Sequence, residues 1–415
     1  MTWGMASLGT VAPPVRSTRQ FRPDEEVWQL NLDQIESQTG RILSKQRGLA
    51  SEAGSSTLIF DEGNVLYSKL RPYLNKVVHP DEPGIATTEL IPLRPRLGVL
   101  LPGFLKFYLR SDRFLNFANQ VVAGAKMPRM IMDKFWDHEI PLPAPREQNR
   151  IVELLEQADA LRQKRAAADT LADRILPALF HKLFGDPATN PKSWPEANGS
   201  QIFSEIRYGV GTPPPFADTG IPFLRAGNID HGTFVPKNLV FFAPEFESSI
   251  GRSHVSTGDV VIVRRGAYTG DCAVIPAAFD GAYVGYDLIC VPSITTNPDW
   301  FCSAFLYPTI WQRVDAIRSR AAQQGLNKEQ ILSFSLPYPP KHLQDRFSHL
   351  AKAVRAQRSQ ASDSKTKLDT LFATMLHRAF TGELTAQWRE AHLKELLAEM
   401  EQQAKALNLP APGKN

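Results

Sequence analysis

The chain has 415 residues, which allows two to four domains with their own cores, and its 43% hydrophobic and 22% charged content is ordinary for a globular protein. No apolar run of about 18 residues exists, so no membrane span is expected, and the N-terminus lacks signal-peptide features, so a cytoplasmic location is expected. The three cysteines are too few for a disulfide framework and lack the CxxC spacing of a metal site, so we expect reduced thiols in or near a core. The net charge of +4 permits nucleic acid without requiring it.

Residues 1–139 contain short β-type runs separated by Gly and Pro, followed by a helical pattern in "PGFLKFYLRSDRFLNFANQ". This segment has 17 Lys and Arg against 15 Asp and Glu, a balance of +2, so any nucleic-acid surface has to be a local patch. The stretch "EGNVLYSKLRPYLNKV" (62–77) offers such a patch on a predicted hairpin, with candidate DNA contacts Lys69, Arg71, Tyr73 and Lys76. Basic residues mixed with a Tyr suit phosphate contacts and readout of base edges, although solvated charges on an exposed hairpin give the same pattern.

Residues 140–185 begin with the Pro-rich stretch "IPLPAPREQNRIVELL" and continue as a helix. The prolines cannot continue a strand ladder and preset extended backbone, so we expect them to end the first domain and to launch the helix at a fixed angle. Steps of four and three, typical of a coiled coil, connect Leu154, Ala158, Leu161, Arg165, Ala168, Ala172, Ile175 and Leu179.

Residues 186–335 again read as short strands followed by a helical pattern, with 11 Lys and Arg against 14 Asp and Glu, a balance of −3. The stretch "TGDVVIVRRGAYTGDC" (257–272) aligns with residues 62–77 and supplies the candidate DNA contacts Arg264, Arg265 and Tyr268. In "RYGVGTPPP" (207–215), three prolines stand where a phosphate-binding helix would have to begin, so we expect a turn and no nucleotide loop.

Residues 336–385 repeat residues 140–185 at an offset of 196 positions, which indicates an internal duplication. Eleven residues recur at this offset: Pro141, Pro143, Gln148, Arg150, Leu154, Ala160, Arg162, Thr170, Asp173, His181 and Phe184 become Pro337, Pro339, Gln344, Arg346, Leu350, Ala356, Arg358, Thr366, Asp369, His377 and Phe380. The second stripe comprises Leu350, Val354, Gln357, Ala361, Ser364, Leu368, Leu371 and Met375. Because polar residues dilute both stripes, each helix needs a partner, and the simplest partner is the other copy, paired antiparallel.

The remaining segment, 386–415, predicts an amphipathic helix that packs on the coiled coil or on a docked partner. Its apolar side comprises Trp388, Leu393, Leu396, Leu397, Met400 and Leu407.

No part of the sequence predicts catalysis, a metal or a cofactor in this chain. It contains no GxxxxGK[ST] loop, no HExxH and no aminomethyltransferase-type Asn/Asp-Pro-Pro-aromatic stretch. The recurring His181 and His377 have no partner carboxylate in view, and helix packing is the simpler interpretation.

The order of parts resembles the DNA specificity subunits of Type I restriction-modification systems over essentially the whole chain. The most specific pieces are "IPLPAPREQNRIVELL", the helix ending "LFHKLFG", and "AFTGELTAQWRE" after the second helix. "GDVVIVRRGAYTG" and "GTPPPFADTGIPFLRAGNIDHG" resemble the second recognition domain of such subunits, and the latter adds Arg225 and Asn228 as candidate DNA contacts.

The resemblance implies an α+β chain: two tandem α/β target recognition domains with curved mixed sheets (1–139 and 186–335), joined by two long spacer helices (140–185 and 336–385) that form an antiparallel coiled coil. Each domain would read half of a split site in double-stranded DNA. Two methyltransferase subunits would dock on the helices and two translocase-nuclease restriction subunits would complete the complex, with S-adenosylmethionine, ATP and Mg held by these partners. Candidate docking residues are Glu147, Gln148, Arg150, Gln344 and Arg346. Since "KHLQDR" replaces "REQNR" in the second copy, docking could be unequal between the halves.

Two other classes stay open. The duplicated domains could form a non-enzymatic scaffold that binds protein or peptide, or an enzyme of two fused domains, although the latter lacks a nucleophile, metal or cofactor constellation. Salt-dependent, sequence-selective binding of duplex DNA distinguishes the first reading from both.

Overall fold

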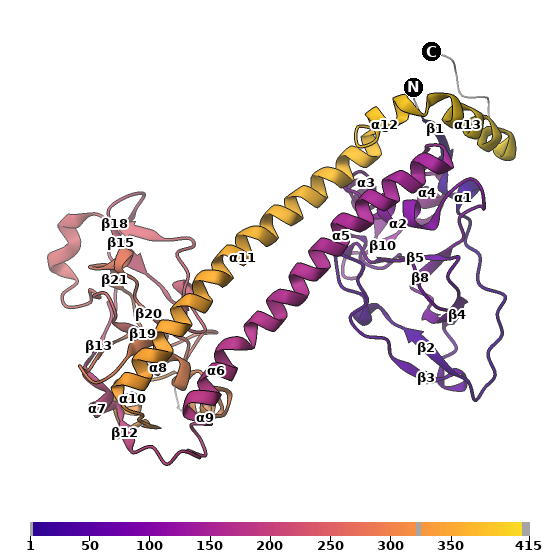
Figure 1. The fold of residues 1–415 in the computed structure, drawn as a ribbon. Coiled ribbons are helices and arrows are strands. Elements are labelled where there is room, and N and C mark those ends of the chain that lie inside the picture. The colour runs from indigo at the N-terminus through magenta and orange to yellow at the C-terminus, as the bar shows by residue number, and fades with distance from the viewer. Residues whose placement is uncertain (1–2, 321–324, 409–415) are drawn as a thin grey trace. The chain divides into compact units, whose positions relative to one another are not determined.

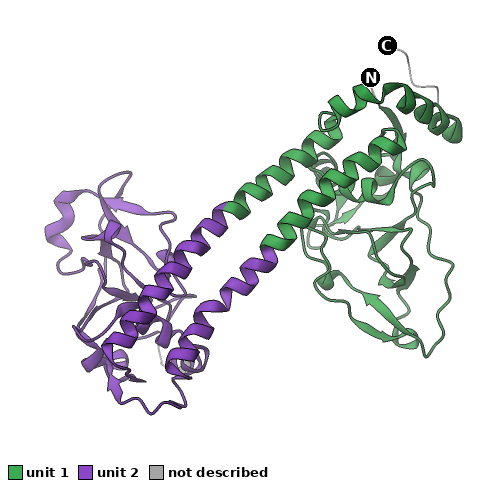
Figure 2. Cartoon of the chain, viewed as in Figure 1, with its two compact units in different colours: residues 1–165, 364–415 green, residues 166–363 purple. Residues whose placement is uncertain are grey.

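The computed structural model describes residues 3–320 and 325–408, which form two compact units (Figure 2). Unit 1 comprises residues 1–165 and 364–415, and unit 2 comprises residues 166–363. Each unit therefore contains one of the two expected recognition domains together with one half of each long helix. Among the described residues, no helix has the length and apolar character needed to span a membrane.

Unit 1 has two main sheets (Figure 1). The first has the order β3-β2-β7-β4, with β3 Arg47–Leu49, β2 Glu26–Leu30, β7 Gly84–Thr87 and β4 Thr57–Phe60. The second has the order β6-β5-β8, with β6 Val77–Val78, β5 Val65–Ser68 and β8 Leu90–Leu93. Because β2 pairs parallel with β7 while the other pairs are antiparallel, the first sheet is mixed, as expected.

Short elements complete unit 1. They are β1 Gly4–Ser7, α1 Leu8–Val11, α2 Pro102–Arg110, α3 Asp112–Gln120, β9 Val122–Ala123, β10 Arg129–Met130, α4 Met132–Asp137 and β11 Glu139–Leu142. Strand β1 pairs antiparallel with β11, which closes the domain at the start of the first long helix. The main core is aromatic and includes the fully buried Phe104, Tyr108, Phe114 and Phe135.

Unit 2 shares much of this topology, although both of its main sheets have four strands. The strand β12 Glu196–Asn198 pairs with β23 Ser335–Pro337, as β1 pairs with β11. One sheet has the order β13-β22-β19-β20, with β13 Phe203–Tyr208, β22 Leu288–Pro292, β19 Val260–Ile262 and β20 Cys272–Val274. The other has the order β14-β18-β15-β21, with β14 Phe216–Ala217, β18 Val240–Phe242, β15 Ile221–Leu224 and β21 Tyr283–Val284. The single parallel pair recurs as β15 with β21, which supports the duplication.

The short helices of unit 2 follow the order of those in unit 1; they are α7 Gly199–Ile202, α8 Pro298–Phe305, α9 Pro308–Arg320 and α10 Lys328–Ser333. The hairpin of β16 Ile229–Asp230 with β17 Thr233–Phe234 follows β15, whereas the hairpin of β9 with β10 in unit 1 follows α3. The cysteines Cys272, Cys290 and Cys302 are buried in this unit as free thiols, as the sequence predicted.

The two long helices differ in continuity. The first is divided into α5 Pro145–Asp173 and α6 Ile175–Phe184, whereas α11 runs unbroken from Lys341 to Thr381. Pro177 explains the division, because it has no N–H for the carbonyl of Asp173 and its ring crowds that carbonyl. The corresponding residue of α11 is Ala373, which a helix accepts.

The helices pair antiparallel in each unit. In unit 1, Glu147 at the start of α5 accepts a hydrogen bond from Thr385, just beyond α11, and Arg162 binds Asp369. In unit 2, Asp173 binds Arg358, and the Phe184 ring lies 5.7 Å from the Phe347 ring. In both units the residue number rises on one helix as it falls on the other, so the expected antiparallel arrangement is confirmed.

The predicted apolar stripe of each long helix lies one residue away from the face that is buried in the structure. Leu161, Ile175 and Leu371 are 53%, 47% and 51% exposed. The side chains that are buried instead include Ile151, Leu155, Phe180, Phe347, Ala351, Phe372 and Leu376. These residues belong to the cores of the recognition domains, so the buried face of each helix is the one that meets its own domain as well as the other helix.

The predicted amphipathic tail forms α12 Ala386–Ala391 and α13 Leu393–Leu407. Leu396 and Met400 pack on Ala144 at the start of the first long helix, and Leu407 reaches the core of unit 1. The prediction that the tail packs on the helix pair is confirmed, although Leu393 stays 42% exposed.

Candidate nucleic-acid interface and docking surfaces

The hairpin of unit 1 presents Arg71 and Tyr73 from a fixed turn between β5 and β6. Arg71 has a left-handed backbone (φ 49°), and its N–H donates to the carbonyl of Pro128 at 2.7 Å. A left-handed non-glycine residue is strained, and such strain persists where surrounding bonds impose it, often at functional sites. Arg71 is exposed and Tyr73 is 47% exposed, so both side chains are accessible to a ligand.

The two lysines of this hairpin are less accessible. Lys69 is half-buried, and the Nζ of Lys76 donates to the carbonyl of Leu32 at 2.5 Å. Burial lowers the pKa of Lys76. Lys76 therefore ties the hairpin to the loop after β2, and Arg71 and Tyr73 remain the stronger candidates for contact with DNA.

The hairpin of unit 2 holds Arg264 between three groups. Its backbone N–H donates to Asp287 Oδ1 at 2.9 Å, its Nε donates to the Leu326 carbonyl at 3.2 Å, and its guanidinium lies 4.7 Å from the centre of the Tyr208 ring. Burial raises the pKa of Asp287 to about 6. The neighbouring Arg265 is exposed and Tyr268 is 52% exposed, so this hairpin combines a positioned cation with accessible side chains.

Arg225 and Asn228 have different roles. Arg225 is exposed, and its guanidinium donates to the Asn238 carbonyl at 2.8 Å. Asn228 is buried, and its amide donates to the carbonyls of Val235 and Lys237 while its oxygen accepts from the Arg225 N–H. Asn228 thus shapes the loop that carries Arg225, and its own side chain is used within the fold.

One candidate that the sequence reasoning missed is Tyr286. It follows β21, is 52% exposed and has a left-handed backbone (φ 59°), with its N–H bonded to the Val210 carbonyl at 3.0 Å. It directly precedes Asp287, so it lies at the same turn that supports Arg264. The aromatic residue between two turn-forming residues in "GYD" was the available signal.

Gln148 and Gln344 perform the same structural task in the two units. The Oε1 of Gln148 accepts from the Leu101 N–H at 2.8 Å, and its Nε2 donates to the carbonyls of Val99 and Pro143. Gln344 accepts from the Asn297 N–H at 2.8 Å and donates to the Pro339 carbonyl. Both side chains are fully buried. They fasten the start of each long helix to its recognition domain, which the repeated Pro-rich stretch alone did not reveal.

Glu147 is also fully buried, and it connects both chain ends to the first long helix. Its carboxylate accepts from Trp3 Nε1 at 3.0 Å, Thr385 Oγ1 at 2.6 Å and Arg389 Nε at 2.7 Å. The side chains of Glu147, Gln148 and Gln344 are therefore occupied within the chain, and docking on them would require their internal bonds to open. Arg150, half-buried beside Glu153, and the exposed Arg346 retain accessible surface.

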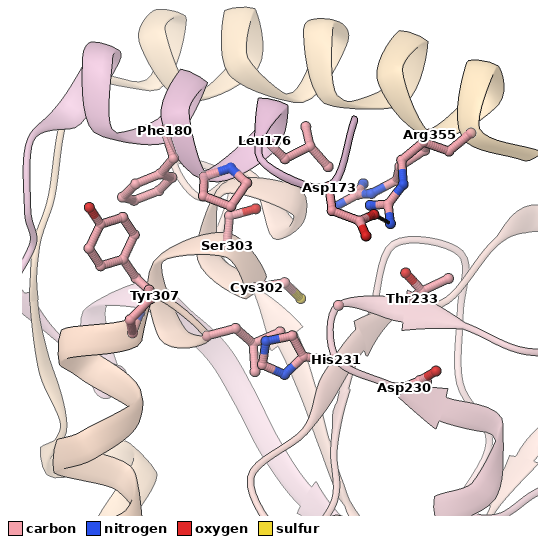
Figure 3. A pocket seen from close by; sticks show the side chains of 15 residues that line it. Asp173, Leu176, Phe180, Asp230, His231, Thr233, Cys302, Ser303, Tyr307 and Arg355 are labelled. Atoms are coloured by element: carbon pink, nitrogen blue, oxygen red, sulfur yellow. Dashed lines mark hydrogen bonds and ion pairs between the residues drawn. The ribbon is translucent and has the colours of Figure 1, made fainter. Parts of the chain in front are cut away.

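A cavity of about 500 Å³ lies in unit 2 between α6, α8, α11 and the turn of the β16–β17 hairpin (Figure 3). Its lining includes Asp173, Phe180, His231, Cys302 and Arg355. His231 lies 3.4 Å from Asp271, whose hydrogen bond raises the histidine pKa. Within the described part of the chain, no group of His, Cys, Asp and Glu has the arrangement of a metal site.

Comparison with known proteins gives a consistent set of relatives. No protein-family model matches the chain. The chain is 23% identical over 319 residues to the specificity subunit of the Type I restriction enzyme EcoKI from Escherichia coli strain K12, covering 72% of this chain and 68% of that protein. It is 22% identical over 314 residues to the EcoBI specificity subunit of E. coli, covering 68% and 66%.

Two solved structures share the fold. A chain from a study of complex assembly and conformational transition of the type I R-M system superposes with a TM-score of 0.56 at 20% identity, covering 92% of this chain and 98% of the other. The S subunit of a Type I restriction-modification system from M. genitalium superposes with a TM-score of 0.56 at 14% identity, covering 91% and 96%.

Proposed function

We propose that the chain is a specificity subunit of a Type I restriction-modification system and that its two recognition domains read the two halves of a bipartite DNA site. The observation that supports this most is the duplication of a whole reading surface. Each unit presents an exposed Tyr and an Arg with a fixed backbone on the hairpin between equivalent strands, Arg71 with Tyr73 and Arg264 with Tyr268. Arginine and tyrosine at fixed positions suit base-edge and phosphate contacts.

The chain itself is a non-catalytic subunit in this proposal. Two methyltransferase subunits dock on the paired long helices, and restriction subunits with translocase and nuclease activity complete the complex. S-adenosylmethionine, ATP and Mg belong to those partners. The repetition of Arg150 as Arg346 supports this, since two similar surfaces on one chain can each accept a copy of the same partner.

The test uses the purified chain with the methyltransferase subunit of its own system. We expect the complex to bind one split duplex sequence more tightly than scrambled duplexes, with affinity that falls as salt rises. We expect the chain alone to show no methylation, nuclease or ATPase activity. Binding without sequence preference in the presence of the partner would instead favour a protein-interaction scaffold, and methylation by the lone chain would contradict the proposal.

A further inference from the structure

The tail helix α13 covers the first of two duplicated surfaces. We call residues 140–150 the first junction and residues 336–346 the second junction; they correspond at the offset of 196 positions. At the first junction, Ala144 is fully buried under Leu396 and Met400. Val99, beside it, is 4% exposed.

Polar contacts make this a specific contact rather than a loose apolar one. Gln403 of α13 donates to the carbonyls of Val99 and Pro143 at 2.8 and 3.1 Å, the same two carbonyls that Gln148 reaches. Arg146 pairs with Glu395 at 2.6 Å and with Glu399 at 3.0 Å. Helix α13 therefore contacts the first junction in three ways: through the apolar Leu396 and Met400, through Gln403, and through the acidic Glu395 and Glu399.

The second junction lacks this cover. Pro340, which corresponds to the buried Ala144, is exposed, and so is Thr295, which corresponds to Val99. Leu343 replaces Glu147 and is half-buried, and the neighbouring Ile294 is 94% exposed. Ile294, Thr295 and Pro340 are therefore exposed where the corresponding part of unit 1 is covered by α13, and Leu343 beneath them packs on the core of unit 2.

We propose that the second junction is the docking surface for an acidic amphipathic helix of the methyltransferase subunit, while α13 closes the first junction as an internal occupant. Exposed Pro340 is at the position of Ala144, on which Leu396 and Met400 pack in unit 1. Lys341 is paired with Asp345, but the exposed Arg346 lies in the second turn of the helix and favours an acidic helix, as Arg146 binds Glu395 and Glu399 in unit 1.

A partner helix is the better occupant than the tail of a second copy of this chain. In each copy the tail is already held in its own unit by Glu147, Arg146 and the carbonyls that Gln403 reaches, and these bonds would have to break first. The inference rests on the proposed function and predicts that two methyltransferase subunits bind with unequal affinity.

The experiment titrates the full chain with its methyltransferase subunit by calorimetry, with native mass spectrometry to count bound subunits. We expect two sites whose affinities differ at least tenfold. The double variant Ile294→Asp/Pro340→Asp changes two exposed residues and should weaken the tighter site at least tenfold, because carboxylates would be buried under the apolar face of an acidic helix. The matched control is Leu97→Asp, a fully exposed apolar residue at the corresponding turn of unit 1, which should leave both sites unchanged.

A second variant tests the internal occupant. Glu395→Lys with Glu399→Lys places like charges against Arg146 and loosens α13 without deleting it, and the weaker site should then tighten severalfold. Two equal sites in the native chain, or an unaffected double variant, would overturn the inference while leaving the proposed function intact. A chain that captures no methyltransferase, or that captures a second copy of itself through Ile294 and Pro340, would overturn it too; only the former contradicts the proposed function.

Discussion

The Nε of Arg162 donates to Oδ1 of Asp369 at 2.7 Å, joining the first long helix to the second within unit 1. The duplicated partners form the reciprocal pair in unit 2, where Arg358 binds Asp173. Each copy of the repeat therefore contributes the arginine to one ion pair and the aspartate to the other. Two such pairs fix the antiparallel register in a region where apolar contacts are few.

Removing the arginines should have unequal effects on stability. Arg162 also lies 4.4 Å from the centre of the Phe372 ring, whereas the residue corresponding to Phe372 in unit 2 is Leu176. We expect Arg162→Ala to cost about 1–2 kcal/mol of unfolding free energy and Arg358→Ala about 0–1 kcal/mol. Urea unfolding of both variants measures this. Equal losses would show that the ring contact contributes nothing.

The buried glutamines should be more important for stability than their polarity suggests. Gln148→Ala removes the acceptor of the Leu101 N–H, although Gln403 still donates to the Val99 and Pro143 carbonyls. Gln344→Ala removes the partners of the Asn297 N–H and the Pro339 carbonyl, and each variant should cost about 1–3 kcal/mol. The exposed Gln157 on the same helix is the matched control, and its replacement by Ala should change stability by less than about 0.5 kcal/mol. Thermal unfolding of the three variants compares them, and a control loss as large as the others would refute the assigned role.

The hairpin arginines should determine DNA affinity. Arg71→Ala or Arg264→Ala should each weaken specific binding by about 1–3 kcal/mol if the side chain reads a base through two hydrogen bonds. Arg252, an exposed arginine outside the hairpin, serves as the control in unit 2. Fluorescence anisotropy on cognate and scrambled duplexes separates the roles: a loss shared by all sequences indicates a phosphate contact, and no loss at either position rejects the hairpins as the reading surface.

Asp287 should make unit 2 less stable as pH rises. Its pKa is raised from 3.8 to about 6 by burial, so its contribution is fully present below about pH 4 and is lost as pH increases through about 6. Asp287→Asn keeps an oxygen acceptor for the Arg264 N–H and removes the charge. We expect this variant to gain roughly 1–3 kcal/mol at pH 8 and little at pH 4, measured by urea unfolding at both values. The exposed Asp218→Asn should show no such difference.

The length of the paired helices should set the number of unread base pairs between the half-sites. The predicted stripes span 26 residues each, Leu154–Leu179 and Leu350–Met375, or roughly 40 Å. Four residues inserted after Arg165 and four after Asp363 lie at the boundary of the two units. They add roughly 6 Å, which corresponds to about one or two base pairs. Methylome sequencing should show both half-sites unchanged and the gap longer; an active variant with the original gap would show that the helices are not the ruler.

Repetition made much of the fold predictable. The offset of 196 residues located both long helices, because identical residues at equal spacing indicate one supersecondary unit used twice. The alignment of residues 62–77 with 257–272 located both hairpins, and the exposed Tyr73 and Tyr268 occupy equivalent positions in it.

The sequence-based predictions that were wrong concern contacts between segments that are distant in the sequence. Whether Leu154 or Leu155 faces inward is decided by the recognition domain against which the helix packs, and periodicity alone cannot distinguish adjacent faces of a dilute stripe. Glu147 seemed a surface residue because a carboxylate is rarely fully buried, yet Trp3, Thr385 and Arg389 satisfy it there. No local sequence pattern predicts that three segments separated by more than a hundred residues will contact the same carboxylate.

The burial of helix residues in the domain cores has a consequence for genetic exchange between such subunits. Phe180, Phe184, Phe347 and Ala351 complete the core of unit 2 although they lie outside residues 186–335. If a recombination event exchanged only residues 186–335, those four side chains would pack against the core of a different subunit's domain. Crossovers near residues 165 and 363 would instead transfer the recognition domain together with the helix residues that complete its core. Recombinants with the latter breakpoints should therefore be the ones that fold and acquire one new half-site, and natural mosaics of this family should carry their joints in the middle of the helices.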